Sequence, residues 1–280
     1  MKKALSLMTA AALVLSLAAC GSTASSAASS EAASSDAASS EAASSEAASE
    51  TETAELSTVE PGKLIMSTNA AFPPYEMTTD SGEFEGIDIE TAQAIADKLG
   101  LELQIDDMDF DAALLSVQQG KADIVMAGVT VTDERKAVMD FSDSYATGIQ
   151  SIIVPNDSEI ASPDDLAGKK IGTQRGTTGY IYCSDDFGDE NVVAYDDGLT
   201  AVQALNNGQV DAVVIDNAPA QEFVAANPGL KVLDTSYAEE DYAIGVAKGS
   251  ALEDAVNKAL EELKADGTLQ AIVDKYINAN

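Results

Sequence analysis

The chain has 280 residues, 45% of them hydrophobic, which is enough for one large domain or two modest ones. Its 48 acidic residues outnumber 15 lysines and arginines, and the formal net charge of −33 excludes a nucleic-acid binder, which needs a basic surface. The chain has no histidine, which excludes Ser-His-Asp catalysis, Cys-His catalysis and histidine-ligated metal sites.

The N-terminus has the pattern of an export signal. Lys2 and Lys3 precede an apolar stretch, residues 4–17, that is too short and too rich in alanine to span a membrane comfortably. The stretch runs into Leu-Ala-Ala-Cys-Gly, which resembles a bacterial lipobox. The resemblance implies that residues 1–20 hold a lipoprotein signal peptide. It also implies that Cys20 is lipidated and that palmitate is one of the attached acyl groups. The alternative is an ordinary signal peptide in which Cys20 is incidental.

Residues 21–60 are predicted to be a disordered tether. Acids recur every five positions, at Glu31, Asp36, Glu41 and Glu46, which advances about 140° per repeat on a helix, so no apolar face forms. The tether has no lysine or arginine, so its acids repel one another. Cys183, the only cysteine besides Cys20, would have no disulfide partner in the mature chain and is expected to be a partly buried thiol.

From residue 63 onward the pattern alternates strands and helices. A strand is expected at 64–68 and a loop at 69–75. Residues 88–99 show the apolar face of a helix that ends at Gly100. The next expected elements are a strand at 101–105, a helix at 111–119 and a buried strand at 122–127.

The segment after this strand has the pattern of an anion site. Gly128 and Thr130 lie in a loop whose backbone N–H groups are predicted to be free to meet an anion. Thr132 is a good N-cap for a short helix that begins with two acids, and Arg135 lies in its first turn. Arginine holds a carboxylate through two parallel hydrogen bonds. The spacing therefore indicates a site for a small carboxylate.

A surface role for this arginine fits the spacing equally well. Arg135 has Asp133 and Asp140 close by in the sequence, and either is a possible partner on a solvated surface. The chain has only one other arginine, Arg175, for which exposure is at least as plausible as a place in the cleft.

The second half of the chain continues the alternation and contains one internal repeat. Residues 113–125 and 201–213 each read as a helix, a glycine stop, a tight turn and a buried strand, which argues for two similar α/β lobes. Ligands of such lobes favour the cleft between them. The remaining expected elements are strands at 149–154, 171–174, 211–215 and 242–246, and helices starting at 163, after 179, and at 200–207, 251–265 and 269–277.

The segment from Met126 to Tyr145 resembles the signature of the family 3 extracellular solute-binding proteins, the receptors of polar amino-acid ABC importers. The resemblance covers residues 63–277 and implies a two-lobed periplasmic-binding-protein type II fold with a ligand cleft between lobes joined by two hinge strands. It implies lobe 1 at 61–146 and 241–280 and lobe 2 at 147–240, with crossings near 145–149 and 238–242. It also implies that Thr130 and Arg135 hold the α-carboxylate of the ligand.

Two further polar residues follow buried strands. Asp216 closes an apolar run, so it places an anion at the mouth of a strand, and the resemblance implies that it receives the α-ammonium group. The alternative is that Asp216 only caps the next segment. Thr177 follows a glycine at a strand-to-helix turn, where backbone donors can meet a carboxylate, and the resemblance assigns it that role.

The side-chain pocket is less determined. Phe72 and Phe110 are expected in loops after strands and resemble the aromatic walls around a ligand's aliphatic part, although either fits a core position. Asn69 matches a position that is often acidic in the family, and Gln174 and Ile215 match positions that vary with the ligand. Ile215 cannot hydrogen-bond a polar side chain.

The resemblance to family 3 and to a lipobox together imply an extracytoplasmic lipoprotein, anchored to the cell membrane, that binds a free polar L-amino acid and delivers it to an ABC permease. We expect a monomer with no cofactor, no metal, no catalytic residue and no nucleic-acid partner. A calcium loop at residues 107–118 is excluded because its sixth position is not glycine and its last is not glutamate. The alternative is an enzyme similar to the cyclohexadienyl dehydratases, for which Glu239 is a candidate acid besides Asp216.

Overall fold

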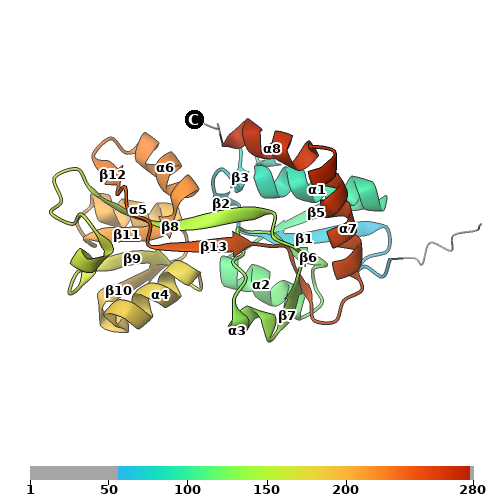
Figure 1. Cartoon of the computed structure of the whole chain (residues 1–280), viewed down its shortest axis with the longest axis horizontal. Helices are drawn as coiled ribbons and strands as arrows, with labels where there is room; N and C mark the ends of the chain where they lie inside the picture. The colour runs from blue at the N-terminus through green and yellow to red at the C-terminus, as the bar shows by residue number, and fades with distance from the viewer. Residues whose placement is uncertain (1–55, 278–280) are drawn as a thin grey trace, which may run out of the picture. The chain divides into compact units, whose positions relative to one another are not determined.

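The structure is a computed structural model that describes residues 56–277. The predicted signal peptide, Cys20 and all but the last five residues of the predicted tether lie outside the described residues. The part of the chain described is a mixed α/β structure with two large sheets (Figure 1). Over residues 56–277, no helix is long and apolar enough to cross a membrane.

The first sheet has the strand order β5-β1-β6-β14-β7. Strand β1 runs parallel to β5 and β6, whereas β14 runs antiparallel to β6 and β7. The strands are β1 (Lys63–Thr68), β5 (Glu102–Asp107), β6 (Ile124–Val125), β7 (Met139–Phe141) and β14 (Gly245–Ala247). Strand β6 is shorter than the predicted 122–127, because the chain leaves the sheet after Val125 for a loop that contains Gly128, whose φ is 55°.

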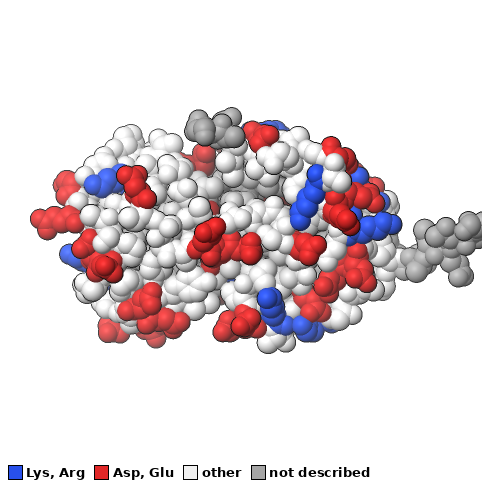
Figure 2. Space-filling view, viewed as in Figure 1, with Lys and Arg blue, Asp and Glu red and all other residues white. Residues whose placement is uncertain are grey.

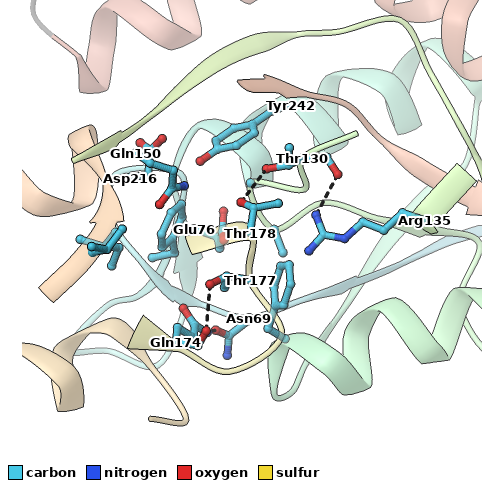
Figure 3. Close-up of a pocket in the computed structure, with 16 residues that line it drawn as sticks. Asn69, Glu76, Thr130, Arg135, Gln150, Gln174, Thr177, Thr178, Asp216 and Tyr242 are labelled. Atoms are coloured by element: carbon cyan, nitrogen blue, oxygen red, sulfur yellow. Dashed lines mark hydrogen bonds between the residues drawn. The ribbon is translucent and has the colours of Figure 1, made fainter. Parts of the chain in front are cut away.

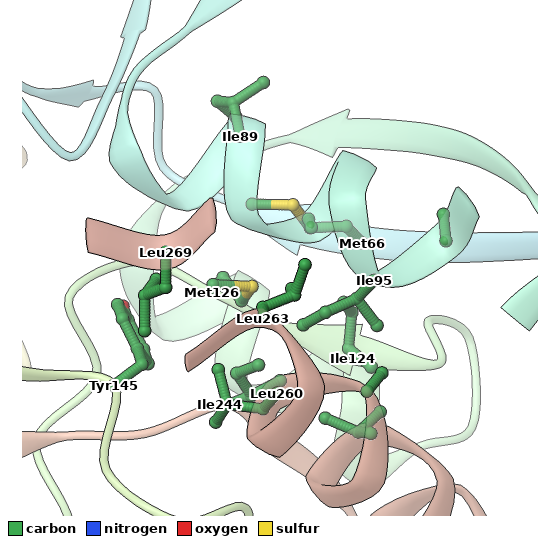
Figure 4. Close-up of a cluster of buried hydrophobic side chains, with 14 of the residues drawn as sticks. Met66, Ile89, Ile95, Ile124, Met126, Tyr145, Ile244, Leu260, Leu263 and Leu269 are labelled. Carbon is green, nitrogen blue, oxygen red and sulfur yellow. The ribbon is translucent and has the colours of Figure 1, made fainter. Parts of the chain in front are cut away.

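Helices α1, α7 and α8 cover one side of this sheet and bury its main core (Figure 4). The apolar face of α1 explains its position, since Ile87, Ala92 and Ile95 are all fully buried there. Gly100 ends α1 in a left-handed conformation, as predicted. The helices of this part are α1 (Ile87–Leu99), α2 (Phe110–Gln118), α3 (Asp133–Lys136), α7 (Leu252–Ala265) and α8 (Thr268–Tyr276).

A small sheet beside the first one was not predicted. Its order is β2-β3-β4, and its strands are β2 (Ala71–Phe72), β3 (Glu76–Thr78) and β4 (Phe84–Glu85). Phe72 therefore lies in a strand and Phe110 begins helix α2, whereas the sequence placed both in loops.

The second sheet has the order β10-β9-β11-β8-β12, with β13 paired to β8. Its strands are β8 (Ala146–Pro155), β9 (Ile171–Gln174), β10 (Val192–Tyr195), β11 (Ala212–Asp216), β12 (Leu230–Val232) and β13 (Ala238–Tyr242). Its helices are α4 (Thr178–Phe187), α5 (Gly198–Asn206) and α6 (Asn217–Ala226), with 3-10 turns at Pro163–Leu166 and Asp189–Asn191. The internal repeat corresponds to α2 and β6 in the first part and to α5 and β11 in the second.

Strands β8 and β13 connect the two parts. They pair antiparallel from Ala238 opposite Gln150 to Tyr242 opposite Ala146. Tyr242 belongs to the core of the first part, while the far half of β8 is buried in the second (Figure 1). The predicted strand at 242–246 is wrong, because β13 ends at Tyr242 and β14 starts at Gly245 in the other sheet. The predicted lobe boundaries stay a prediction.

Candidate functional site

One pocket is lined by residues from both parts of the chain, on either side of β8 and β13 (Figure 3). The nine residues predicted to bind the ligand all line it: Asn69, Phe72, Phe110, Gly128, Thr130, Arg135, Gln174, Thr177 and Asp216. Seven residues that were not predicted to bind the ligand also line it: Glu76, Ala127, Gln150, Thr178, Val214, Ile215 and Tyr242. Their contacts with a ligand stay predictions.

Arg135 is held in this pocket by its own helix cap. Thr132 Oγ1 accepts a hydrogen bond from Arg135 N at 3.2 Å, as expected of an N-cap. The guanidinium donates from Nη1 to Thr130 O at 2.8 Å and from Nη2 to Gly176 O at 3.1 Å, and it is stacked over the Phe110 ring. The Arg135 residue is only 8% exposed, so the surface alternative is wrong.

The acids that were candidate partners for Arg135 are engaged elsewhere or exposed. Asp140 forms a salt bridge with Lys248 at 2.5 Å. Arg175 behaves differently from Arg135, since its side chain is 57% exposed and lies 3.6 Å from Asp196. Arg175 does not line the pocket.

Glu240 links the two parts behind the pocket, and the sequence did not reveal it. Its Oε2 atom accepts hydrogen bonds from Thr178 Oγ1 at 3.0 Å, Gln150 Nε2 at 2.9 Å and Thr130 Oγ1 at 3.2 Å. The sequence had indicated its neighbour Glu239, which is exposed. Side chains alternate along a strand, so the residue after Glu239 on β13 faces inward. This register could be found only once β13 was known to be a strand.

Asp216 is both a cap and a pocket residue. Its Oδ1 accepts a hydrogen bond from Ala218 N at 3.2 Å, which caps helix α6. Its Oδ2 accepts from Ile149 N at 2.7 Å. The Asp216 residue is 2% exposed, and burial raises the pKa of its carboxyl to about 6. Capping therefore does not remove Asp216 from the pocket, since it fixes the carboxylate at the pocket wall, and the contact with an α-ammonium group stays a prediction.

Amide groups of the two parts meet at the other end of the pocket (Figure 3). Gln174 Nε2 donates to Asn69 Oδ1 at 2.8 Å, and Asn69 Nδ2 donates to Met108 O at 2.9 Å. Thr177 caps helix α4 and donates from Oγ1 to Gln174 O at 2.8 Å. Ile215 contributes an apolar wall.

Gly128 does not offer the free backbone donor that the sequence predicted. Its N–H group donates to Asp88 Oδ2 at 3.0 Å. A side chain at this position would be strained, because φ is positive and a Cβ atom would lie 2.9 Å from the Phe72 ring. Gly128 therefore lets the loop pass close to the pocket wall.

Glu76 is the most unexpected residue of the pocket. It begins β3, is 0% exposed, and within residues 56–277 neither of its carboxyl oxygens accepts a hydrogen bond from an N–H or hydroxyl group. Burial raises the pKa of Glu76 well above its usual value, and the Asp88 charge raises it further. Burial also raises the pKa of Asp88 to about 6, against the lowering effect of the Gly128 N–H. No local sequence pattern distinguishes Glu76 from an exposed acid.

The family of the chain follows from comparison with known sequences. Residues 64–279 match the family described as bacterial extracellular solute-binding proteins, family 3. The chain belongs to this family. The resemblance seen in the segment from Met126 to Tyr145 is therefore confirmed over nearly all of the residues that the structure describes.

Individual members of family 3 are similar over most of the chain. It is 34% identical over 225 residues to the L-cystine-binding protein TcyJ of Escherichia coli K12, covering 79% of this chain and 85% of that protein. It is 31% identical over 288 residues to the arginine-binding extracellular protein ArtP of Bacillus subtilis 168, covering 99% and 98%.

A solved structure supports the same grouping. An ancestral arginine-binding protein bound to arginine has a TM-score of 0.74 at 42% identity, covering 78% of this chain and 99% of that one. The predicted two-lobed type II fold is confirmed by this likeness.

Proposed function

We propose that this family 3 protein binds a free L-amino acid in the pocket between its lobes and delivers it to the permease of an ABC importer. The observation that carries the proposal is a pair of opposite charges in one pocket, Arg135 and Asp216. A free amino acid is a zwitterion, so its two ends match this pair. Relatives named for binding cystine and arginine support an amino-acid ligand, while their names leave the side chain open.

In this proposal each pocket residue has a distinct role. Arg135, with Thr130 and Thr177 beside it, receives the α-carboxylate, and Asp216 receives the α-ammonium group. The guanidinium already donates to two neutral carbonyl groups, and a carboxylate is a stronger acceptor than either. Phe72 and Phe110 flank the aliphatic part of the ligand. Gly128, Asn69 and Gln174 complete the walls.

Contacts between the two parts suggest how a ligand is enclosed. Arg135 reaches Gly176, Gln174 reaches Asn69, and Thr130 lies 3.4 Å from Thr178 through their hydroxyl groups. Each of these contacts joins a residue of the part built on the first sheet to a residue of the part built on the second. A ligand that touches both lobes favours this closed arrangement, because only differential contacts shift such an equilibrium.

The relatives described above are named as binding proteins, so we do not propose the dehydratase alternative. We propose further that the protein acts as a monomer on the extracytoplasmic face of the membrane.

A panel of ligands tests the amino-acid proposal. The purified protein should be stabilised against heat by at least one free L-amino acid, by about 2.7 kcal/mol at 100 times its dissociation constant. The matching amino-acid amide, which lacks the α-carboxylate, should stabilise much less. A protein whose melting temperature no free amino acid changes, or that binds the amide equally well, would contradict the proposal.

The membrane anchor is a separate proposal that rests on the residues before position 21. Replacing Cys20 by serine should abolish lipidation and move the protein from the membrane fraction to the soluble one. The matched control is Cys183→Ala, which removes the chain's other cysteine, a fully buried thiol, and should leave the protein on the membrane. Cell fractionation with metabolic labelling by palmitate measures both. A Cys20→Ser protein that stays membrane-bound and labelled would show the anchor proposal to be wrong.

A further inference from the structure

Within residues 56–277, Glu76 and the carboxyl groups that act on it have no positively charged partner. The charged groups that act on Glu76 are Asp88, from α1, and Asp107, from the end of β5, and both are acids. The other titratable groups that face it are the hydroxyls of Tyr75 and Tyr145. Arg135 is directed elsewhere, to the carbonyl groups of Thr130 and Gly176. Glu76 therefore lines the pocket with two further acids acting on it and, among the residues that the structure describes, no cation beside it.

A buried carboxylate without a partner is too costly to persist. Taking an isolated ionised carboxyl out of water costs many kcal/mol, so such a group keeps its proton or acquires a cation. In the free protein, Glu76 and Asp88 are neighbours that can share a hydrogen bond only if one of them is protonated. Asp88 already accepts the Gly128 N–H, which favours Asp88 as the charged member and Glu76 as the protonated one.

We propose that this pocket takes amino acids with a cationic side chain, and that the side-chain cation replaces the proton held between Glu76 and Asp88. The inference rests on the proposed amino-acid function, whose α-group contacts lie elsewhere, at Arg135 and Asp216. The apolar walls Phe72 and Ile215 suit the aliphatic stem that guanidinium and ammonium side chains share.

The exchange balances in charge and atoms. Before binding, the Glu76–Asp88 pair holds one proton and carries one negative charge. The ligand brings one positive charge, the proton leaves Glu76 for the solvent, and the ionised pair then faces the cation. No other bond forms or breaks. An uncharged side chain of similar shape cannot displace the proton.

Two ligands that differ only in side-chain charge test the selectivity. L-citrulline has nearly the shape of L-arginine but carries a neutral urea group. Calorimetry should show that the wild-type protein binds arginine more tightly than citrulline. Glu76→Gln should weaken arginine binding by at least about 30-fold, because the buried ligand cation loses a charged partner, and should change citrulline binding much less.

The matched control is Glu85→Gln on the neighbouring strand β4, where the side chain is exposed. This variant should bind both ligands like the wild type. Equal wild-type affinity for arginine and citrulline, or a Glu76→Gln protein that retains its preference for arginine, would overturn the inference and leave the amino-acid proposal standing. A protein that binds neither these ligands nor any other free amino acid would overturn both.

Proton release provides a second test that needs no variant. Arginine binding, measured near neutral pH in buffers of different ionisation enthalpy, should release close to one more proton than citrulline binding does. Because a proton is a product of binding, the affinity for arginine should also fall as the pH falls, beyond any change for citrulline. Equal proton release for the two ligands would overturn the exchange at Glu76.

Discussion

Replacing Arg135 by alanine is expected to weaken binding of the best amino-acid ligand by about 2–5 kcal/mol, because a buried α-carboxylate would lose its charged partner. The Arg135 residue is 8% exposed, so water does not replace the missing guanidinium freely. Calorimetry on wild-type and variant proteins measures the difference. Arg135→Lys should also weaken binding, since an ammonium group cannot form the two parallel hydrogen bonds.

The second arginine of the chain serves as the control. Arg175→Ala removes a side chain that is 57% exposed and outside the pocket, so its effect on affinity should be small. Near wild-type affinity in Arg135→Ala would contradict the assignment of the α-carboxylate to this residue, whatever the Arg175→Ala protein does.

Local patterns were enough to single out Arg135 and its cap as candidates, and the structure places Arg135 in the pocket. Thr132, the acids after it and Arg135 lie within one short helix, and their roles follow from cap and dipole rules that act over a single turn. The same is true of Asp216, which ends a buried strand and caps the helix after it. Helix caps and helix-dipole interactions can be predicted from the sequence because the interacting residues are neighbours in the chain.

The burial of Glu76 and Glu240 depends on long-range contacts, and the sequence did not predict it. Glu76 is buried where β3 packs beside helix α1, which carries Asp88. Glu240 meets Thr130 and Thr178 across 110 and 62 residues of chain. The predicted strand at 242–246 failed for a related reason, since the chain changes sheets there. Pairing partners and register were needed, and neither is a local property.

The buried acids should make the unliganded protein lose stability as the pH rises. Burial raises the pKa values of Asp88 and Asp216 from 3.8 to about 6 in the folded protein. A carboxyl whose folded pKa is raised stabilises the folded state below its unfolded pKa, and this contribution is lost as the pH rises through the folded pKa. Each shift of about 2 units corresponds to about 3 kcal/mol. The free energy of unfolding should therefore fall between about pH 4 and about pH 7.

Denaturant unfolding of the ligand-free protein across this pH range measures the fall in the free energy of unfolding. One substitution shows how much of this fall comes from Asp88. Asp88→Asn keeps an oxygen that can accept the Gly128 N–H and adds a donor for Glu76, so it should reduce the pH dependence. Asp254→Asn, an exposed acid in the first turn of α7, is the matched control and should leave the dependence unchanged. Stability that instead rises from pH 5 to pH 7 in the wild type would contradict the prediction.

A bound cationic amino acid should oppose this loss of stability as the pH rises. Its α-ammonium group at Asp216 and its side chain at Glu76 and Asp88 each favour the ionised carboxyls, so binding lowers the pKa values that burial raised. The ligand should therefore stabilise the protein more at pH 7 than at pH 5 when both are measured at the same free ligand concentration, because its dissociation constant is lower at pH 7. The folded state without ligand is destabilised by the same buried carboxyls that hold the ligand. If arginine stabilised the protein equally at the two pH values, the buried carboxyls would not be the groups that hold the ligand, and the prediction would be wrong.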